Sequence, residues 1–368
     1  MKVVVVGAGV CGLAIGWKLA RAGASVTVLE RSHIGGGATM ASEGIIASGG
    51  GLERQAVTAW PAFREALEAE SKIDIGWHCD GALRVRQLGD GNAPSPHLDG
   101  DEVHAIEPLL GPLVAGADMV PEASVDSQAL CRALAVALVR AGGEILSNEA
   151  AVRFEWDGKR VTGVTTPFTV HHADMFVLAM GAWSSRVDGL PPGAIPAVRP
   201  VKGEVVVLAP PSVSALPRRA VHGQYVRLVP QRDRLLVGAT IEDAGFDTCL
   251  SQAALRWLYQ EATALMPSLA GWRRVEHWAG LRAVAADGQP VLGPAVIDGL
   301  AVASGLFSSG ILLAPTVAEV LSRFILDRTA VDPACDPRRF ESGSPDAPLA
   351  ETPHKDVSGE AETWRTGS

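Results

Sequence analysis

Three glycines and one acid near the start of the chain have the types and spacing of a nucleotide-phosphate site. Gly7, Gly9 and Gly12 follow an apolar run at residues 2–6, and Glu30 lies 18 residues after Gly12. In a strand–turn–helix unit, the first glycine permits a tight turn, the second lets the backbone approach a pyrophosphate, and the third lets helix and strand pack closely. An acid at the end of the next strand accepts hydrogen bonds from both ribose hydroxyls. The pattern therefore predicts FAD or NAD, rather than NADP, as a ligand.

The helix that follows these glycines is expected to supply further phosphate contacts. Val10 and Cys11 occupy its first turn, where unpaired N–H groups and the positive end of the helix dipole favour anions. In this interpretation Cys11 faces the helix, so we expect no covalent bond between its sulfur and a cofactor. A glycine-rich turn without a ligand is the alternative, but it does not explain why strand, helix and acid accompany the glycines.

The hydrophobic pattern contains the elements that must position these residues. Two apolar runs with a helical segment between them predict a βαβ unit. Asp126 is predicted to cap a helix that ends at Gly142–Gly143, and Asp157–Gly158 is predicted to turn a hairpin. The predicted strands lie at residues 2–6, 25–30, 151–166 (the hairpin), 176–185 and 198–240, and the predicted helices at 10–22, 52–72, 124–146, 251–266 and 310–328.

The composition is that of a globular protein with more than one domain. The chain has 368 residues, of which 47% are hydrophobic and 20% charged, and its net charge is −9. This length predicts two interlocked domains. The negative charge argues against nucleic acid or an anionic membrane surface as the main partner. No segment has the roughly 18 consecutive apolar residues that a membrane span needs.

The termini and the cysteines lead to three expectations. The N-terminal apolar run is broken by glycines and continues into a helix and a second strand, so it predicts a strand rather than a signal peptide, and hence a cytoplasmic protein. Five cysteines without C-x-x-C spacing predict neither a disulfide framework nor a metal site. Residues 341–368 are rich in Ser, Pro, Glu and Thr and predict a disordered tail.

Downstream segments favour FAD over NAD. Arg31 directly follows the acid, and a Gly-Gly-Gly-Ala-Thr run occupies residues 35–39. LAMGAWSS (178–185), HWAGLRAVAADGQPVLG (277–293) and SGLFSSGILLAPTVAEVL (304–321) follow in order. With these segments the chain resembles, over about residues 1–330, the D-amino-acid oxidase superfamily of FAD-dependent flavoproteins, and within it the glycine oxidases.

The resemblance implies an α/β fold in which two domains are interleaved. A Rossmann-like FAD-binding domain is expected from residues 1–72, 124–197 and 278–340. A substrate domain of α+β type, built on an antiparallel sheet, is expected from residues 73–123 and 198–277.

The resemblance also implies which residues surround FAD. The segment after the acid is expected to wrap the pyrophosphate and lead to the flavin ring, and the backbone of Val152 is expected near adenine. Ser309, Gly310 and Ile311 open an apolar helix whose N–H groups can face a flavin carbonyl. Beyond the glycine turn, the implied FAD contacts are Arg31, Gly37, Ala38, Thr39, Ser42, Glu43, Gly44, Ile45, Val152, Gly181, Trp183, Arg282, Ser308, Ser309, Gly310 and Ile311.

Arg282 is the residue expected to bind the substrate carboxylate. It matches the substrate arginine of the family, and apolar residues, Trp278 and Leu281, flank it. A guanidinium binds a carboxylate through two parallel hydrogen bonds, which lysine cannot do. The alternative is an arginine at the surface or in a structural salt bridge.

The chain departs from the glycine oxidases at three positions. Ser308 stands where the family has an arginine, Arg227 where it has a substrate-binding tyrosine, and Glu43 where it usually has alanine. Tyr225, two residues before Arg227, is a candidate replacement for the tyrosine. Glu43 and Arg227 are either a solvated pair without a role or residues that reshape the pocket for a substrate with another charged group. We therefore expect a larger or more polar substrate than glycine.

The expected activity is the FAD-dependent oxidative deamination of glycine, a small D-amino acid or a related amine. The products would be an imine or 2-oxo acid, ammonia and hydrogen peroxide, with dioxygen as the electron acceptor. Two alternatives remain from the sequence: a dehydrogenase of the same fold that reduces a quinone or carrier, and a non-catalytic flavoprotein subunit. The sequence leaves homo-oligomer formation open.

Overall fold

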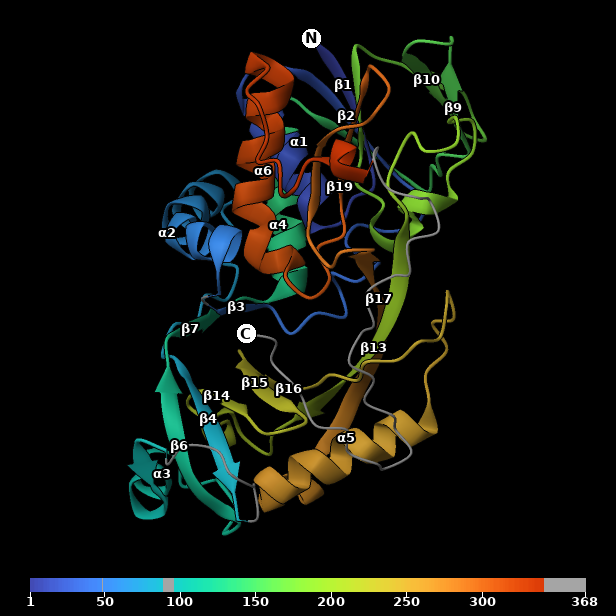
Figure 1. The fold of residues 1–368 in the computed structure, drawn as a ribbon. Coiled ribbons are helices and arrows are strands. Elements are labelled where there is room, and N and C mark those ends of the chain that lie inside the picture. The colour runs from blue at the N-terminus through green and yellow to red at the C-terminus, as the bar shows by residue number, and fades with distance from the viewer. Residues whose placement is uncertain (48, 89–95, 341–368) are drawn as a thin grey trace.

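The computed structural model of the protein describes residues 1–47, 49–88 and 96–340, and the predicted tail at 341–368 lies outside them (Figure 1). A six-stranded sheet forms the upper part of the molecule. In order across the sheet, its strands are β18 (Val291–Pro294), β19 (Leu300–Ser304), β12 (Met175–Leu178), β1 (Lys2–Val6), β2 (Ser25–Glu30) and β8 (Glu144–Ser147). All neighbours are parallel except the β18–β19 pair. This is the Rossmann-like arrangement that the sequence predicts.

Both faces of this sheet are covered, which explains why four consecutive valines follow Lys2 in β1. Val3 and Val5 pack toward the helices, whereas Val4 and Val6 pack toward a three-stranded sheet on the opposite side. The helices are α1 (Val10–Arg21), α2 (Gly51–Ser71), α4 (Ser127–Arg140) and α6 (Gly310–Asp327), and the small sheet consists of β9 (Arg153–Trp156), β10 (Val161–Thr165) and β11 (Val170–His172).

Local signals in the sequence account for several element boundaries. The carboxylate of Asp126 accepts hydrogen bonds from the backbone N–H groups of Gln128 and Ala129, so the predicted cap of α4 is confirmed. The predicted hairpin forms between β9 and β10. The predicted end of this helix at Gly142–Gly143 is confirmed, and residues 144–146, the last of the segment 124–146, belong to β8.

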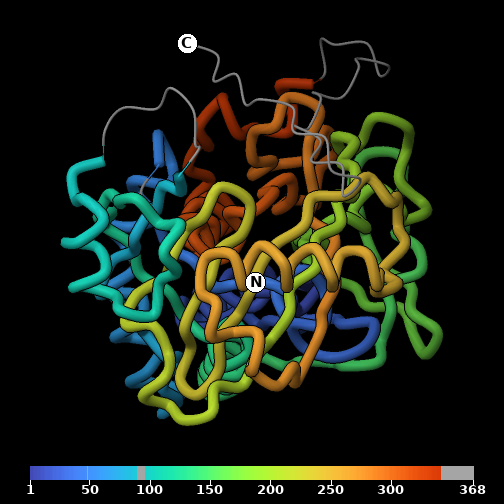
Figure 2. The backbone as a smooth tube through the Cα atoms, turned by 90° about the horizontal axis from the view of Figure 1, so that it is seen from below, coloured from blue at the N-terminus to red at the C-terminus, as the bar shows by residue number. Residues whose placement is uncertain are grey.

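The lower part of the molecule is built on an eight-stranded, mostly antiparallel sheet. In order, its strands are β17 (Arg273–Ala285), β13 (Val198–Ala209), β16 (Arg234–Gly238), β15 (Arg227–Gln231), β14 (Ala220–His222), β4 (Ala82–Gln87), β6 (Val114–Val120) and β5 (Leu98–Asp99). The helices α3 (Gly100–Ile106) and α5 (Gln252–Leu265) pack against it. In the view from below, α5 and the larger sheet lie in front of the N-terminal segments (Figure 2).

The two parts are joined by long strands and a small sheet. β13 and β17 pair along their whole length and run from the larger sheet to the upper part of the molecule (Figure 1). The short strands β3 (Ile45–Ala47) and β7 (Glu122–Ser124) pair at the junction. The 3₁₀ helices are η1 (Gly181–Arg186), η2 (Val213–Ala215), η3 (Pro267–Gly271) and η4 (Pro337–Phe340). We propose that the two large sheets are the centres of the two domains predicted from the sequence.

Two further properties concern the part of the chain that the structure describes. Within it, no helix has the length and apolarity to cross a membrane. The same residues contain no group of three or more His, Cys, Asp or Glu side chains able to hold a metal ion.

Candidate active site

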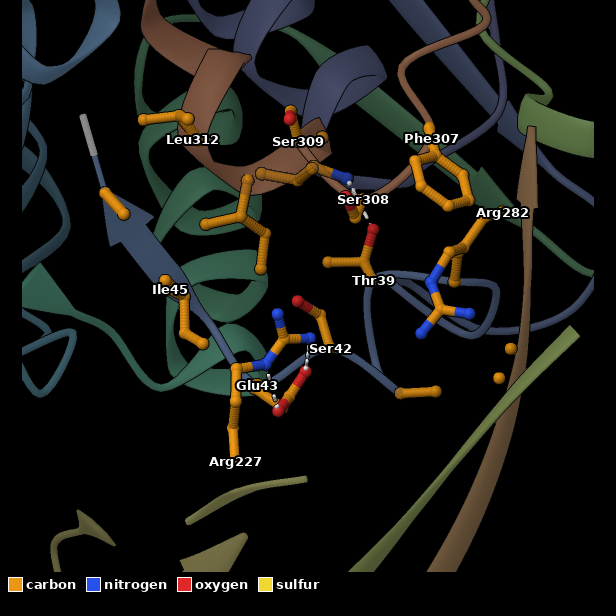
Figure 3. A pocket seen from close by; sticks show the side chains of 18 of the residues that line it. Thr39, Ser42, Glu43, Ile45, Arg227, Arg282, Phe307, Ser308, Ser309 and Leu312 are labelled. Carbon is orange, nitrogen blue, oxygen red and sulfur yellow. Dashed lines mark hydrogen bonds and ion pairs between the residues drawn. The ribbon is translucent and has the colours of Figure 1, made fainter. Parts of the chain in front are cut away.

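Two cavities that share part of their lining lie between the upper sheet and the larger sheet. The first, which we call the sheet-edge cavity, measures about 400 Å³ and opens at the carboxyl ends of β1, β2, β12 and β19. The second, the junction cavity, measures about 260 Å³ and lies among the loop after β2, the start of α6, and the strands β13, β15 and β17 (Figure 3). Both are lined by Val10, Ala38, Thr39, Arg282, Phe307 and Gly310.

The glycine turn borders the sheet-edge cavity, and its three glycines have different surroundings. Gly7 has a φ of +110°, and a Cβ there would lie 2.4 Å from the carbonyl oxygen of Ala179. A Cβ at Gly12 would lie 1.9 Å from the carbonyl oxygen of Gly7, so both glycines are fixed by packing. At Gly9, however, a Cβ would meet only the hydroxyl of Thr39 at 3.5 Å and would otherwise occupy the cavity. Gly9 therefore provides the backbone approach that a pyrophosphate needs.

Glu30 is held at the end of β2 by two backbone donors. Its carboxylate accepts hydrogen bonds from the N–H of Ala8, at 3.0 Å, and from the N–H of Ser32, at 2.9 Å. It also lines the sheet-edge cavity. The carboxylate thus has a fixed place beside the glycine turn, and the donor groups, the open space at Gly9 and this acid together fit the adenosine and pyrophosphate of FAD.

An aromatic and cationic wall borders the same cavity. The guanidinium of Arg31 stacks on the ring of Trp183 in η1, 3.9 Å from its centroid. Arg186, which the sequence reasoning missed, also lines the cavity and stacks on Phe246 at 4.2 Å. Val152 does not line this cavity. Its N–H donates a hydrogen bond to the carbonyl of Thr165, and the residue is 51% exposed. Its neighbours Ala150 and Ala151 line the cavity instead.

The start of α6 borders the junction cavity. Ser308, Ser309, Gly310 and Ile311 all line it, and the first N–H groups of α6 have no partner within the helix. The hydroxyl of Ser309 donates to the carboxylate of Glu53, 2.7 Å away, which is a lining residue that sequence reasoning did not find. These N–H groups and the helix dipole make this end of the cavity favourable for a partial negative charge.

Arg282 extends from β17 into the wall that the two cavities share. Its Nη1 donates hydrogen bonds to the carbonyls of Thr240, at 3.0 Å, and Lys202, at 3.3 Å. Burial lowers the pKa of Arg282 to about 10. A Cβ at Gly203 would lie 2.2 Å from Nη1, so glycine on β13 leaves the space that the guanidinium fills. Among the residues that the structure describes, no carboxylate forms an ion pair with Arg282. This argues against the alternative that Arg282 belongs to a structural salt bridge.

Glu43 and Arg227 form a bidentate ion pair in the junction cavity (Figure 3). Nε of Arg227 lies 3.0 Å from Oε1 of Glu43, and Nη2 lies 2.7 Å from Oε2. The side chain of Glu43 is only 7% exposed and that of Arg227 is 39% exposed. Glu43 raises the pKa of Arg227 above its usual value. Glu43 is therefore buried, whereas Arg227 is partly exposed, so only one member of the pair is solvated.

The other predicted residues fall inside and outside the cavities. Gly37 and Gly181 line the sheet-edge cavity, and Ser42 and Ile45 line the junction cavity. The structure does not bring Gly12, Gly44 or Tyr225 to either: a Cβ at Gly44 would meet the carbonyl of Val125 at 1.9 Å, and Tyr225 lies in the turn between β14 and β15. The sequence reasoning missed Glu53, Gly203, Gly280 and Phe307. Glycines inside strands are a usable signal for Gly203 and Gly280.

Comparisons with known proteins agree with this geometry. A family model described as FAD dependent oxidoreductase, DAO, matches residues 2–324. The glycine oxidase of Pseudomonas aeruginosa is 33% identical over 359 residues, which cover 90% of this chain and 97% of that protein. The bifunctional protein ThiO/ThiG of Trichormus variabilis is 32% identical over 350 residues, which cover 89% of this chain and 53% of that protein. The chain thus spans about half the length of this second relative.

Solved structures show the same architecture. Glycine oxidase from Geobacillus kaustophilus superimposes with a TM-score of 0.82 and 29% identity, over 96% of this chain and 100% of the other. Glycine oxidase from Bacillus cereus gives a TM-score of 0.83 at 24% identity, over 96% and 99% of the two chains. The α/β fold predicted from the sequence is confirmed, and the chain belongs to the DAO family of FAD-dependent oxidoreductases.

Proposed function

We propose that this protein oxidises the carbon–nitrogen bond of a small amino acid or related amine. The observation that carries the proposal is Arg282, a guanidinium at the boundary of two cavities that has no carboxylate partner among the described residues. A desolvated cation of this kind is stabilised by an anionic ligand. The similarity to the glycine oxidase of Pseudomonas aeruginosa supports an amino acid as that ligand.

The residues of the chain divide the work between the two cavities. We assign the sheet-edge cavity to the nucleotide part of FAD, with Gly9, the start of α1 and Glu30 as its contacts. The loop at Ala38 and Thr39 lines both cavities and leads from the nucleotide toward the substrate. When bound, FAD supplies the acceptor for the two electrons that leave the substrate carbon as a hydride.

The junction cavity would bind and orient the substrate. Arg282 would hold the carboxylate through two hydrogen bonds, which fixes the carbon that bears the amine. The first N–H groups of α6 would stabilise negative charge on the flavin ring of FAD. Phe307 and Ile45 contribute apolar surface that limits water around the reacting carbon. The ammonium group of the substrate would give up a proton to solvent water before the carbon is oxidised, so no side-chain base is required for that transfer.

The overall reaction that we propose consumes an amino acid, dioxygen and water. The substrate is first oxidised to an imine, and water then converts the imine to a 2-oxo acid and ammonia. The two electrons and two protons removed from the substrate reduce dioxygen to hydrogen peroxide, which balances the reaction.

A substrate panel on the FAD-loaded protein tests the proposal. Glycine, sarcosine, D-alanine and D-proline would be added without oxygen while the flavin absorbance is followed, and oxygen uptake and peroxide would be measured afterwards. Bleaching by at least one amino acid, with peroxide formed on aeration, is expected. Bleaching without oxygen uptake would show that a molecule other than dioxygen accepts the electrons. A flavin that no amino acid or amine bleaches would refute the proposal. Arg282→Ala is the matched control, since it should keep the flavin spectrum and bleach much more slowly.

A further inference from the structure

The junction cavity contains four charged side chains, and three of them have side-chain partners. Glu43 pairs with Arg227, and Glu53 accepts a hydrogen bond from the hydroxyl of Ser309. In the part of the chain that the structure describes, Arg282 donates hydrogen bonds only to backbone carbonyls, and its guanidinium lies 5.9 Å from the ring centroid of Phe307. The two guanidinium groups extend into the cavity from different sides, and Glu43 lies against Arg227 (Figure 3). Of the two arginines in the cavity, Arg282 is therefore the one whose guanidinium has no carboxylate partner among the described residues.

The Glu43–Arg227 pair is geometrically complete. Both oxygens of the carboxylate are used, and they take the Nε and one terminal nitrogen of the guanidinium at 3.0 and 2.7 Å. This fork-to-fork arrangement is the strongest that arginine forms with a carboxylate. A second anion approaching Arg227 would gain little attraction and would meet the negative charge of Glu43 in a partly desolvated space.

Gln231 and Gly238 keep Glu43 in this position. The side-chain amide of Gln231 donates to the carbonyl of Glu43 at 3.0 Å and to that of Val125 at 2.9 Å. On β16, a Cβ at Gly238 would lie 3.0 Å from Oε1 of Glu43, so glycine leaves the space that the carboxylate occupies. The acid is thus built into the wall rather than free to turn away from an incoming ligand.

We propose that Glu43 determines specificity by neutralising Arg227, so that the enzyme accepts substrates with one carboxylate and rejects those with two. This inference rests on the proposed function and names its substrate class: amino acids or amines whose remaining groups are neutral. Removal of Glu43 would convert Arg227 into a second anion site. The sequence left open whether Arg227 meets the substrate or an acid of the protein, and the observed pair favours the acid.

The test compares ligands that differ in charge but not in size. Succinate and its monoamide, succinamate, cannot be oxidised as amino acids, so their Kd values on the FAD-loaded protein, measured by calorimetry, report binding alone. We expect the parent to bind succinamate at least about tenfold more tightly than succinate, because the second carboxylate of succinate would face the carboxylate of Glu43. Glu43→Ala and Glu43→Gln should narrow or reverse this ratio by at least about tenfold. The kcat/KM ratio of D-aspartate to D-asparagine should change in the same direction.

Two control variants separate this effect from a general change in charge. Glu43→Ala combined with Arg227→Ala should lose the gain in succinate affinity, because the second anion site is removed. Glu107→Gln removes a buried acid that accepts a hydrogen bond from the backbone N–H of Arg218 and lines neither cavity, and it should leave the ratio of the parent unchanged. The flavin content of each variant would be checked before titration.

The outcomes distinguish this inference from the proposed function. If the parent binds succinate with the same affinity as succinamate, the inference is overturned whether or not the variants fold. It is equally overturned if Glu43→Ala and Glu43→Gln leave the succinate-to-succinamate ratio unchanged while D-alanine is still oxidised. If no amino acid bleaches the flavin but the Kd ratios change as expected, the charge assignment of Glu43 stands and the proposed function fails.

Discussion

Replacement of Gly203 by alanine should disable Arg282 without unfolding the protein. The new Cβ would lie 2.2 Å from Nη1 of Arg282, 2.4 Å from Nη2 and 2.5 Å from Cζ. Ordinary contacts of this kind are about 3.5–4.0 Å, so the guanidinium must move by roughly 1 Å or more. A misplacement of about 1 Å near reacting groups can cost about 100-fold in rate, and we expect a loss of that order in kcat/KM for the best amino acid. The strand itself should tolerate alanine, which is a better strand residue than glycine.

The assay follows kcat/KM, flavin absorbance and thermal stability in Gly203→Ala and Arg282→Ala, singly and together. Loss of one partner of a buried charged contact costs about 2–5 kcal/mol, so Arg282→Ala should lose about 30-fold to several thousand-fold in kcat/KM. Gly203→Ala should add nothing in the Arg282→Ala background, because both changes remove the same interaction. Gly271→Ala is the control, since a Cβ there meets no atom within 4 Å. A Gly203→Ala enzyme with the kcat/KM of the parent would refute the reasoning.

Three further predictions concern cofactor binding, stability and pH. Acid precipitation of the purified protein should release FAD. Gly9→Ala should abolish FAD binding while the apoprotein keeps its Tm. Gly12→Ala, in contrast, should lower the Tm, because its Cβ would lie 1.9 Å from the carbonyl oxygen of Gly7. Lys202→Met should lower the free energy of unfolding by about 1–3 kcal/mol in a denaturant titration, because the fully buried Glu204 loses Lys202 at 2.7 Å and keeps only His277 and the backbone N–H of Ser251 as partners. The affinity for acetate, which stays ionised, should fall as the pH rises through about 10, because burial lowers the pKa of Arg282 to that value and only the protonated guanidinium binds an anion; constant affinity up to pH 11 would show that Arg282 stays charged.

Features encoded locally could be predicted from the sequence. The glycine turn, the valines of β1 and Glu30 lie within the first 30 residues, and short-range spacing alone indicates the βαβ unit. The cap at Asp126 is equally local. Arg282 was found through the resemblance to a family, and the structure places it at the boundary of the two cavities.

Features that depend on distant pairs could not be predicted in the same way. Glu43 and Arg227 are 184 residues apart, and Glu53 and Ser309 are 256 apart, so no local pattern indicates that they meet. Residues 144–146 illustrate a different difficulty, because so short a segment with two apolar residues fits a helix or a strand until its neighbours are known. In this chain their partner is β2, which lies more than a hundred residues earlier.

The glycines of the larger sheet connect the stability of the fold with its function. Gly203 on β13 and Gly280 on β17 are direct partners across the sheet, and Gly238 on β16 lies opposite Val205. Each is a position where glycine weakens a strand. However, a side chain at Gly203 would displace Arg282, one at Gly238 would displace Glu43, and one at Gly280 would come within 3.0 Å of the Cα of Ala38. The sheet therefore gives up side-chain packing where the two charged groups and the loop after β2 must approach its backbone. Because each glycine accommodates a different group, we expect alanine at Gly203 to impair carboxylate binding, alanine at Gly238 to disturb the Glu43–Arg227 pair, and alanine at Gly280 to affect the loop that joins the two cavities.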